Sequence, residues 1–103
     1  MQKEITLLAL QQIKPRLAAE GFELHALFGS AARGDQNDQS DIDLLYRITP
    51  EFGRRYPGFE AMARVEEIKT ELSALLGRPV DLAPVDYLGP IGQKYILPDA
   101  INV

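Results

Sequence analysis

Cysteine and tryptophan are absent from the 103 residues, and histidine occurs once, at position 25. Without cysteine the chain can form neither a disulfide framework nor a cysteine-ligated zinc site, and His25 alone cannot make a multi-histidine metal centre. No stretch approaches the roughly 18 apolar residues of a transmembrane helix, and the first residues lack the layout of a signal peptide. We therefore expect a cytoplasmic protein without a membrane segment, whose chemistry depends on carboxylates and hydroxyls.

Basic residues are in the minority, because 11 lysines and arginines stand against 15 aspartates and glutamates, for a formal net charge of −4. A protein that coats nucleic acid needs a basic surface to neutralise phosphates, so direct nucleic-acid binding is not expected. The acidity favours metal ions or a basic partner instead. The length predicts one domain, residues 1–103, which can bury roughly 65% of its unfolded surface.

Apolar residues at helical spacing predict two long helices that cover a sheet. The stripe of the first comprises Ile5, Leu8, Ala9, Ile13 and Leu17. Pro15 either kinks this helix or begins a second one, which ends at Gly21. The later helix begins near Phe59 and ends at Gly77. Its stripe comprises Phe59, Met62, Val65, Ile68, Leu72, Leu75 and Leu76.

Three β-prone segments, residues 22–28, 41–48 and 79–83, alternate with these helices. His25 falls in the middle of the first and is interpreted as structural or solvated. Between and after them, the sequence predicts short irregular or helical pieces. They are a helical segment at 31–33, a polar turn at 34–40, a loop at 49–58 and a last helix at 91–97. Together these elements predict an α/β or α+β fold, a small mixed sheet with helices mainly on one face.

The most informative pattern is Gly29-Ser30 followed, after ten residues, by Asp41-Ile-Asp43. A glycine and a serine directly after a strand offer backbone N–H groups and a hydroxyl to a phosphate. Side chains two apart on a strand share a face, so Asp41 and Asp43 are predicted to project together. Paired carboxylates repel each other unless a cation lies between them, and oxygen ligands suit Mg²⁺ or Mn²⁺. Asp81 could complete the set, although the aspartates could also be plain turn and surface residues.

These motifs resemble a known family. Residues 29–34, Gly-Ser-Ala-Ala-Arg-Gly, and residues 40–45, Ser-Asp-Ile-Asp-Leu-Leu, look like the signature of the DNA polymerase β-type nucleotidyltransferase superfamily. More narrowly, they resemble the minimal nucleotidyltransferases, the MntA-like antitoxins that are paired with HEPN-domain (HepT-like) toxins. The resemblance implies the nucleotidyltransferase fold.

The resemblance also implies a role for each motif residue. Gly29 and Ser30 would hold a nucleoside triphosphate, and Arg33 would be a secondary phosphate or structural contact. Asp81 would lie nearest the acceptor hydroxyl and help to deprotonate it. The ligands of two Mg²⁺ ions would be Asp41, Asp43 and Asp81. In the implied reaction a hydroxyl attacks the α-phosphorus of ATP or another nucleoside triphosphate, and pyrophosphate leaves.

The chain is short, and the residues around the motifs are needed for the helices, so we expect the acceptor hydroxyl to come from another protein. The resemblance implies AMP transfer to a tyrosine of a HEPN toxin, which silences its RNase activity within a hetero-oligomer. Two alternatives stay open. One is a non-catalytic antitoxin that neutralises its toxin by contact alone. The other is a small-molecule nucleotidyltransferase with a separate acceptor-binding subunit.

Two stretches have the aromatic, aliphatic and arginine content of a partner surface. The first contains Phe52, Arg54, Arg55, Tyr56 and Phe59. The second is the tail, with Ile91, Tyr95, Ile96, Leu97, Ile101 and Val103. In both cases the alternative is that the stretch packs on the domain itself.

Overall fold

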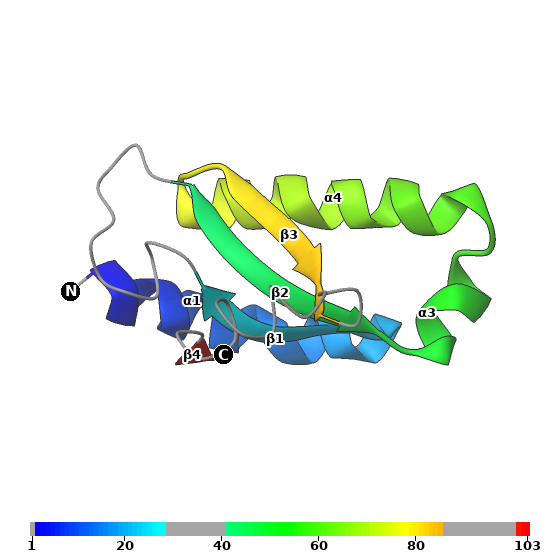
Figure 1. Cartoon of the computed structure of the whole chain (residues 1–103), viewed down its shortest axis with the longest axis horizontal. Coiled ribbons are helices and arrows are strands. Elements are labelled where there is room, and N and C mark those ends of the chain that lie inside the picture. Colours follow the sequence, from blue (N-terminus) through cyan, green and yellow to red (C-terminus); the bar gives the residue numbers. More distant parts are fainter. Residues whose placement is uncertain (1, 29–40, 86–100) are drawn as a thin grey trace.

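A computed structural model describes residues 2–28, 41–85 and 101–103 of the chain. Its elements in chain order are α1 (Gln2–Glu20), β1 (Phe22–Phe28), β2 (Ile42–Ile48), α3 (Pro50–Arg55), α4 (Phe59–Leu76), β3 (Val80–Pro84) and β4 (Ile101–Asn102) (Figure 1). The strands form one sheet in the order β3-β2-β1-β4. Strand β2 is parallel to β3 and antiparallel to β1, and β4 is antiparallel to β1. The predicted mixed sheet is therefore confirmed.

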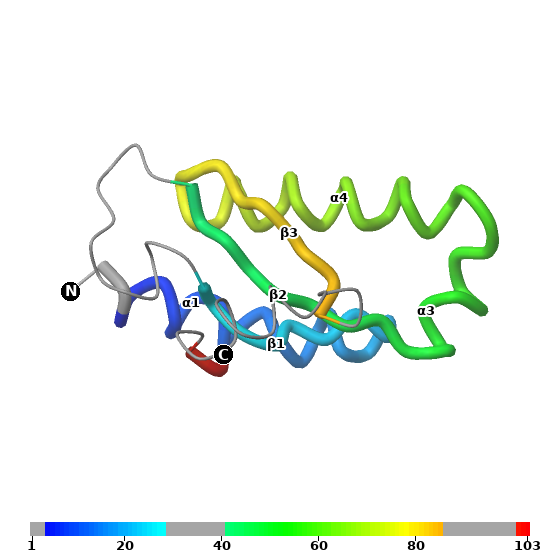
Figure 2. Tube along the Cα trace, in the orientation of Figure 1, coloured from blue at the N-terminus to red at the C-terminus, as the bar shows by residue number. Residues whose placement is uncertain are grey.

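The described long helices cover one face of this sheet, with α1 along β1 and α4 along β3 (Figure 2). Alternate strand residues point toward the helices and form the core with them. The fully buried core residues are Leu10, Leu17, Phe22, Leu24, Leu27, Ile42, Leu44, Phe52, Ile68, Leu72 and Val80. In the described part of the chain, neither long helix is apolar enough to cross a membrane.

Two predicted helix ends are confirmed at glycines that adopt positive φ. Gly21 has φ +94°, and a Cβ added there would lie 2.5 Å from the backbone nitrogen of Phe52, so a side chain does not fit. The Thr49 N–H donates to the Gly21 carbonyl at 2.9 Å, which holds the end of β2 against this turn. Gly77 has φ +70° and donates its N–H to the Ser73 carbonyl, closing α4.

The stretch predicted as a loop, residues 49–58, contains the helix α3. Pro50 lies in its first turn, where a missing N–H removes no helical hydrogen bond, and acidic and basic residues fall at the ends that suit the helix dipole. Phe52 is fully buried, with its ring centroid 6.0 Å from that of Phe22. The loop prediction was wrong because burial of Phe52 stabilises a helix too short to form on its own.

Helix α1 is a single helix that includes Pro15, so of the two alternatives left open at Pro15 the second helix is wrong. Its buried positions are Thr6, Leu10 and Leu17, whereas Ile5 and Leu8 of the predicted stripe are 64% and 60% exposed. Apolar residues lie on more than one side of α1. Periodicity alone therefore could not identify which side faces the sheet.

The stripe of α4 divides in the same way. Ile68 and Leu72 are buried, whereas Phe59 and Met62 are exposed. With 18 residues α4 is about 27 Å long. The adjacent edge strand β3 has five residues and spans about 17 Å. The first turns of α4 therefore extend beyond the end of β3, as Figure 1 shows.

The end of the chain forms a strand that the sequence did not predict. Ile101 is opposite Leu27 in the β1–β4 pair, and both Ile101 and Val103 pack against the core. For these two residues, assignment to a partner surface is wrong. A two-residue strand is too short to leave a pattern. The predicted segments at 31–33, 34–40 and 91–97 lie outside the described residues, as do Ile91, Tyr95, Ile96 and Leu97.

Candidate functional site

A row of paired residues crosses three strands at one end of the sheet. Phe28 of β1 is the Cα partner of Asp43 in β2, and Asp43 is the partner of Asp81 in β3. Because neighbouring strands lie about 4.8 Å apart and paired residues share a face, the two aspartates are adjacent. Their strand neighbours Ile42 and Val80 are buried against the helices, so Asp43 and Asp81 occupy the opposite face.

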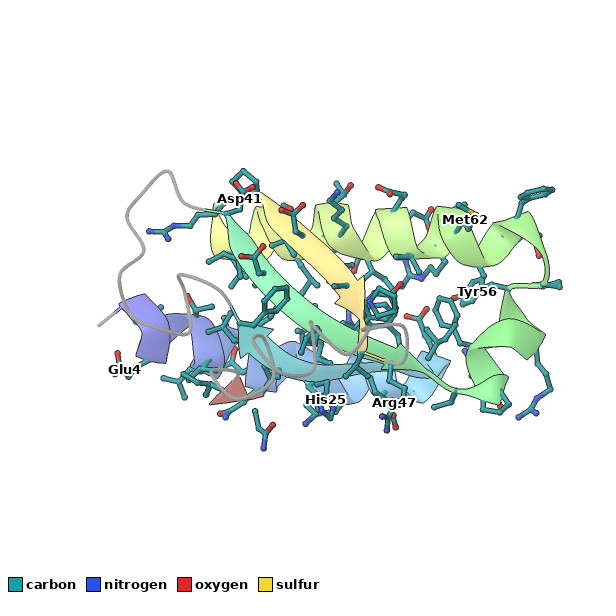
Figure 3. The ribbon with its side chains drawn as sticks, viewed as in Figure 1. Glu4, His25, Asp41, Arg47, Tyr56 and Met62 are labelled. Atoms are coloured by element: carbon teal, nitrogen blue, oxygen red, sulfur yellow. The ribbon has the colours of Figure 1, made fainter. Side chains whose placement is uncertain are left out.

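Asp41 lies at the same end of the sheet, directly before β2, and is exposed (Figure 3). The Ile42 N–H next to it donates to the Pro79 carbonyl at 2.9 Å. This hydrogen bond fixes the beginning of β2 against the beginning of β3. The three aspartates therefore come from one end of the parallel pair of strands.

Gly29, Ser30 and Arg33 lie outside the described residues. The chain nevertheless enters this segment from a defined point, because Gly29 directly follows Phe28, the partner of Asp43. The sheet thus brings the aspartates to the strand end from which the predicted phosphate-binding segment continues.

Sequence reasoning missed one residue at this place, Lys69 of α4. Its Nζ lies 3.9 Å from Asp81 Oδ1, with both side chains partly exposed. An exposed ion pair of this kind contributes at most about 1 kcal/mol to stability. Its position matters more, because it puts a positive charge beside two adjacent carboxylates. The only signal for this contact in the sequence is the short turn between α4 and β3, which brings β3 back alongside the helix.

Carboxylate oxygens are suitable ligands for a hard divalent cation. Residues 2–28, 41–85 and 101–103 contain no group of three acidic, histidine or cysteine side chains that could together hold a metal ion. Mg²⁺, however, is usually bound by one or two carboxylates together with substrate phosphates. The adjacent Asp43 and Asp81 match that donor set, so the residues present fit a divalent cation bound with a nucleotide.

A second cluster of charges serves the fold. Arg64 donates from Nε and Nη2 to the two carboxylate oxygens of Glu20, both at 2.7 Å, and the Tyr56 hydroxyl donates to Glu20 Oε1 at 2.7 Å. The hydrogen bonds from Arg64 lower the pKa of Glu20 to about 2, although burial acts in the opposite direction. The hydrogen bond to Glu20 raises the pKa of Tyr56. These contacts join α1 to α4 and to the segment after α3.

This cluster also revises the first predicted partner surface. Phe52 belongs to the core and Tyr56 is bonded to Glu20, so both stabilise the domain. Arg54 and Arg55 are exposed and form ion pairs with Glu51 at 3.3 and 3.4 Å. Among the three aromatic residues proposed there, Phe59 is the exposed one.

Comparison with known proteins gives consistent matches across the chain. The family model described as a nucleotidyltransferase domain matches residues 10–101. The putative protein adenylyltransferase MJ0435 of Methanocaldococcus jannaschii is 32% identical over 93 residues, which cover 90% of this chain and 91% of that protein. The putative protein adenylyltransferase MJ1379 of the same organism is 37% identical over 79 residues, or 76% of this chain and 73% of that one.

A solved structure, described as that of a putative minimal nucleotidyltransferase, superposes with a TM-score of 0.73 at 28% identity. It covers 100% of this chain and 97% of its own. The family match includes the strands that carry Asp43 and Asp81, together with the Gly-Ser segment between β1 and β2. The chain therefore belongs to the nucleotidyltransferase-domain family, and it is an enzyme of the nucleotidyl-transferring class, as the resemblance of its motifs predicted.

Proposed function

We propose that this nucleotidyltransferase moves AMP from ATP to the hydroxyl group of a tyrosine in a partner protein. The observation that carries the proposal is the adjacent pair Asp43 and Asp81, beside the strand end that leads into Gly29. Family membership supports nucleotidyl transfer. A protein acceptor is supported by the two relatives whose names describe protein adenylyltransferases.

The proposed reaction is an in-line displacement. The acceptor oxygen forms a bond to the α-phosphorus, the bond from that phosphorus to the bridging oxygen of the β-phosphate breaks, and pyrophosphate leaves. Asp81 takes up the hydroxyl proton and releases it to solvent. A phenol, with an unperturbed pKa near 10, requires less help than an aliphatic alcohol. Gly29 and Ser30 hold the triphosphate, with Arg33 as a secondary contact.

We further propose two Mg²⁺ ions, held by Asp41, Asp43 and Asp81. When bound, Mg²⁺ neutralises the charge that develops on the attacking and leaving oxygens. The protein's part is to hold the carboxylates in one row of the sheet. In the absence of a cation these carboxylates repel each other, and Lys69 offsets part of that repulsion at Asp81.

The partner that we propose is a HEPN-domain toxin of the HepT-like kind. The chain would act as its antitoxin in the cytoplasm, within a hetero-oligomer, by adenylylating a tyrosine of the toxin. Neutralisation by contact alone and transfer to a small molecule presented by another subunit are the two alternatives that the experiment must separate.

The test incubates the protein with ATP labelled at the α-phosphate, Mg²⁺ and the HEPN-domain toxin proposed as its partner. We expect label on a tyrosine of the toxin with the wild type, and none with the Asp41→Ala/Asp43→Ala variant. A variant that transfers no label yet still neutralises the toxin would show that contact alone is sufficient for neutralisation. Label on a small molecule alone would favour the third possibility.

A further inference from the structure

The first turns of α4 expose apolar side chains that nothing in the described fold uses. Phe59 is 89% exposed, Met62 is 69% exposed and Ile48, at the end of β2, is 44% exposed. Single exposed apolar residues are ordinary, but a contiguous group of them marks a surface that contacts something. Met62 and Ile48 meet at one pocket, and Phe59 precedes Met62 by one helical turn.

This pocket has a volume of about 270 Å³ and lies between α4 and the end of β2. Val65, Met62 and Ile48 make its wall apolar, and Glu66 places a carboxylate at its edge. A cavity of this kind accepts one large apolar side chain. The carboxylate favours a basic neighbour for that side chain, in keeping with the net charge of −4.

The exposed residues continue along α4 to the candidate site. Phe59, Met62, Glu66 and Lys69, here called the α4 stripe, are spaced by three, four and three residues, so they share one side of the helix. Figure 3 labels Met62 in the half of α4 that extends beyond β3. At the other end of the stripe, Lys69 Nζ contacts Asp81. The rise of about 1.5 Å per residue places Met62 and Lys69 about 10 Å apart along the helix axis.

We propose that the α4 stripe is the docking surface for the acceptor protein, and that the segment it binds is an amphipathic helix. The three-four-three spacing is that of a seam between two packed helices. An apolar side chain of the acceptor fills the pocket beside Met62, and a lysine or arginine one turn away pairs with Glu66. The acceptor hydroxyl lies about two turns from the apolar side chain, next to Asp81. This inference rests on the proposed function.

The arrangement accounts for features that the proposed reaction leaves unused. Phe59 and Met62 lie in the part of α4 that extends beyond the end of β3, and they bury little of their surface within the domain. Docking there presents a hydroxyl from the side of Asp81, the carboxylate that the reaction assigns to the acceptor.

The test measures binding of the HEPN-domain toxin proposed as the acceptor to wild type, Met62→Glu and Glu66→Lys, with Leu8→Glu as control. Leu8 is exposed to a similar extent but lies on α1, away from the stripe. We expect Met62→Glu and Glu66→Lys each to raise Kd about tenfold, which corresponds to about 1.4 kcal/mol, and Leu8→Glu to leave it unchanged. In the transfer assay KM for the toxin should rise while kcat stays constant.

Equal binding by wild type and the stripe variants overturns the docking surface, and so does the lack of any binding by the wild type. Binding that depends on the stripe without transfer of label contradicts the proposed function but supports the surface. Thermal melts with ATP and Mg²⁺ check the variants, because a docking residue should not change the shift in Tm that nucleotide produces.

Discussion

Glu20 keeps its negative charge in a site where its side chain is 16% exposed. The hydrogen bonds from Arg64 lower its pKa from an ordinary 4.5 to about 2. A lowered pKa in the folded state means that the group stabilises the fold above pH 4.5, where the unfolded chain is also ionised. This contribution is lost as the pH falls toward about 2, where the folded protein is protonated as well.

We expect Glu20→Gln to lower the free energy of unfolding by about 2 kcal/mol at pH 7, because Arg64 and Tyr56 lose a charged hydrogen-bond acceptor. Between pH 5 and about 2 the difference from wild type should shrink, since wild type loses the same contribution on protonation. Urea denaturation at several pH values measures both effects. Glu51→Gln, which removes two exposed ion pairs, should cost less than about 1 kcal/mol. A difference that does not depend on pH would contradict this role of Glu20.

Lys69 allows a prediction about the candidate site that does not depend on activity. Its ammonium competes with a divalent cation for Asp81, so Lys69→Met should lower the Mg²⁺ concentration that gives half of the ATP-dependent shift in Tm. A severalfold decrease is expected, in line with about 1 kcal/mol between charges 4 Å apart in water. Arg54→Met, which removes an exposed cation far from the aspartates, is the control. An unchanged or higher half-saturating concentration would contradict the prediction.

At the scale of single residues, the sequence predicted positions that follow from local spacing. Asp43 could be placed on a strand with Asp41 beside its beginning, because the two are two residues apart; the predicted strand began at Asp41, whereas β2 begins one residue later, at Ile42. Contacts between distant segments could not be predicted. Arg64 is 44 residues from Glu20, and only the packing of α4 against α1 brings them together. The proximity of Lys69 to Asp81 likewise depends on how α4 and β3 pack.

Two phenylalanines in and after α3 differ in burial and therefore in their contribution to stability. Phe52 of α3 is fully buried with its ring near that of Phe22 in β1, and Phe59 begins α4 with 89% of its surface exposed. The same residue type, seven positions apart, thus contributes to stability in one case only.

We expect Phe52→Ala to lower the free energy of unfolding by about 3 to 4 kcal/mol, because it leaves a cavity in the core. Phe59→Ala should change it by less than about 0.5 kcal/mol. Chemical denaturation of the two variants measures the contrast. Similar losses of stability in both would mean that α3 does not hold Phe52 in the core as described.

Among the elements, the strands β1, β2 and β3 and the two glycine-terminated helix ends were predictable, because alternation and glycine act locally. The side that a helix buries was not. In α1 and α4 apolar residues occur on both the buried and the exposed sides, so Ile5, Leu8, Phe59 and Met62 were expected in stripes that cover the sheet. Helix α3 and strand β4 were missed because each is short and depends on tertiary contacts.

At the scale of the whole molecule, the topology of the sheet determines where the candidate site lies. Asp43 and Asp81 are 38 positions apart, and α4 lies between them in the chain, yet the parallel pairing of β2 with β3 makes them neighbours. A strand–helix–strand unit of this kind requires a crossover of about a dozen residues or more, which α3 and α4 supply. The same crossover sets the α4 stripe beside Asp81, so one unit of structure carries both the proposed catalytic carboxylates and the proposed docking surface.

The central claim is that Asp43 and Asp81 act together in nucleotidyl transfer to a protein. The most direct measurement follows ATP labelled either at the α- or at the γ-phosphate, with Mg²⁺ and the HEPN-domain toxin. It compares wild type, Asp43→Asn, Asp81→Asn and the surface control Glu23→Gln.

We predict that wild type and Glu23→Gln put the α-label on the toxin and release the γ-label in pyrophosphate, while each aspartate variant transfers at least a hundredfold less. The loss should occur without a change in folding, which thermal melts without nucleotide will check. Transfer of the γ-label to protein, or full α-label transfer by Asp43→Asn and Asp81→Asn, would contradict the account.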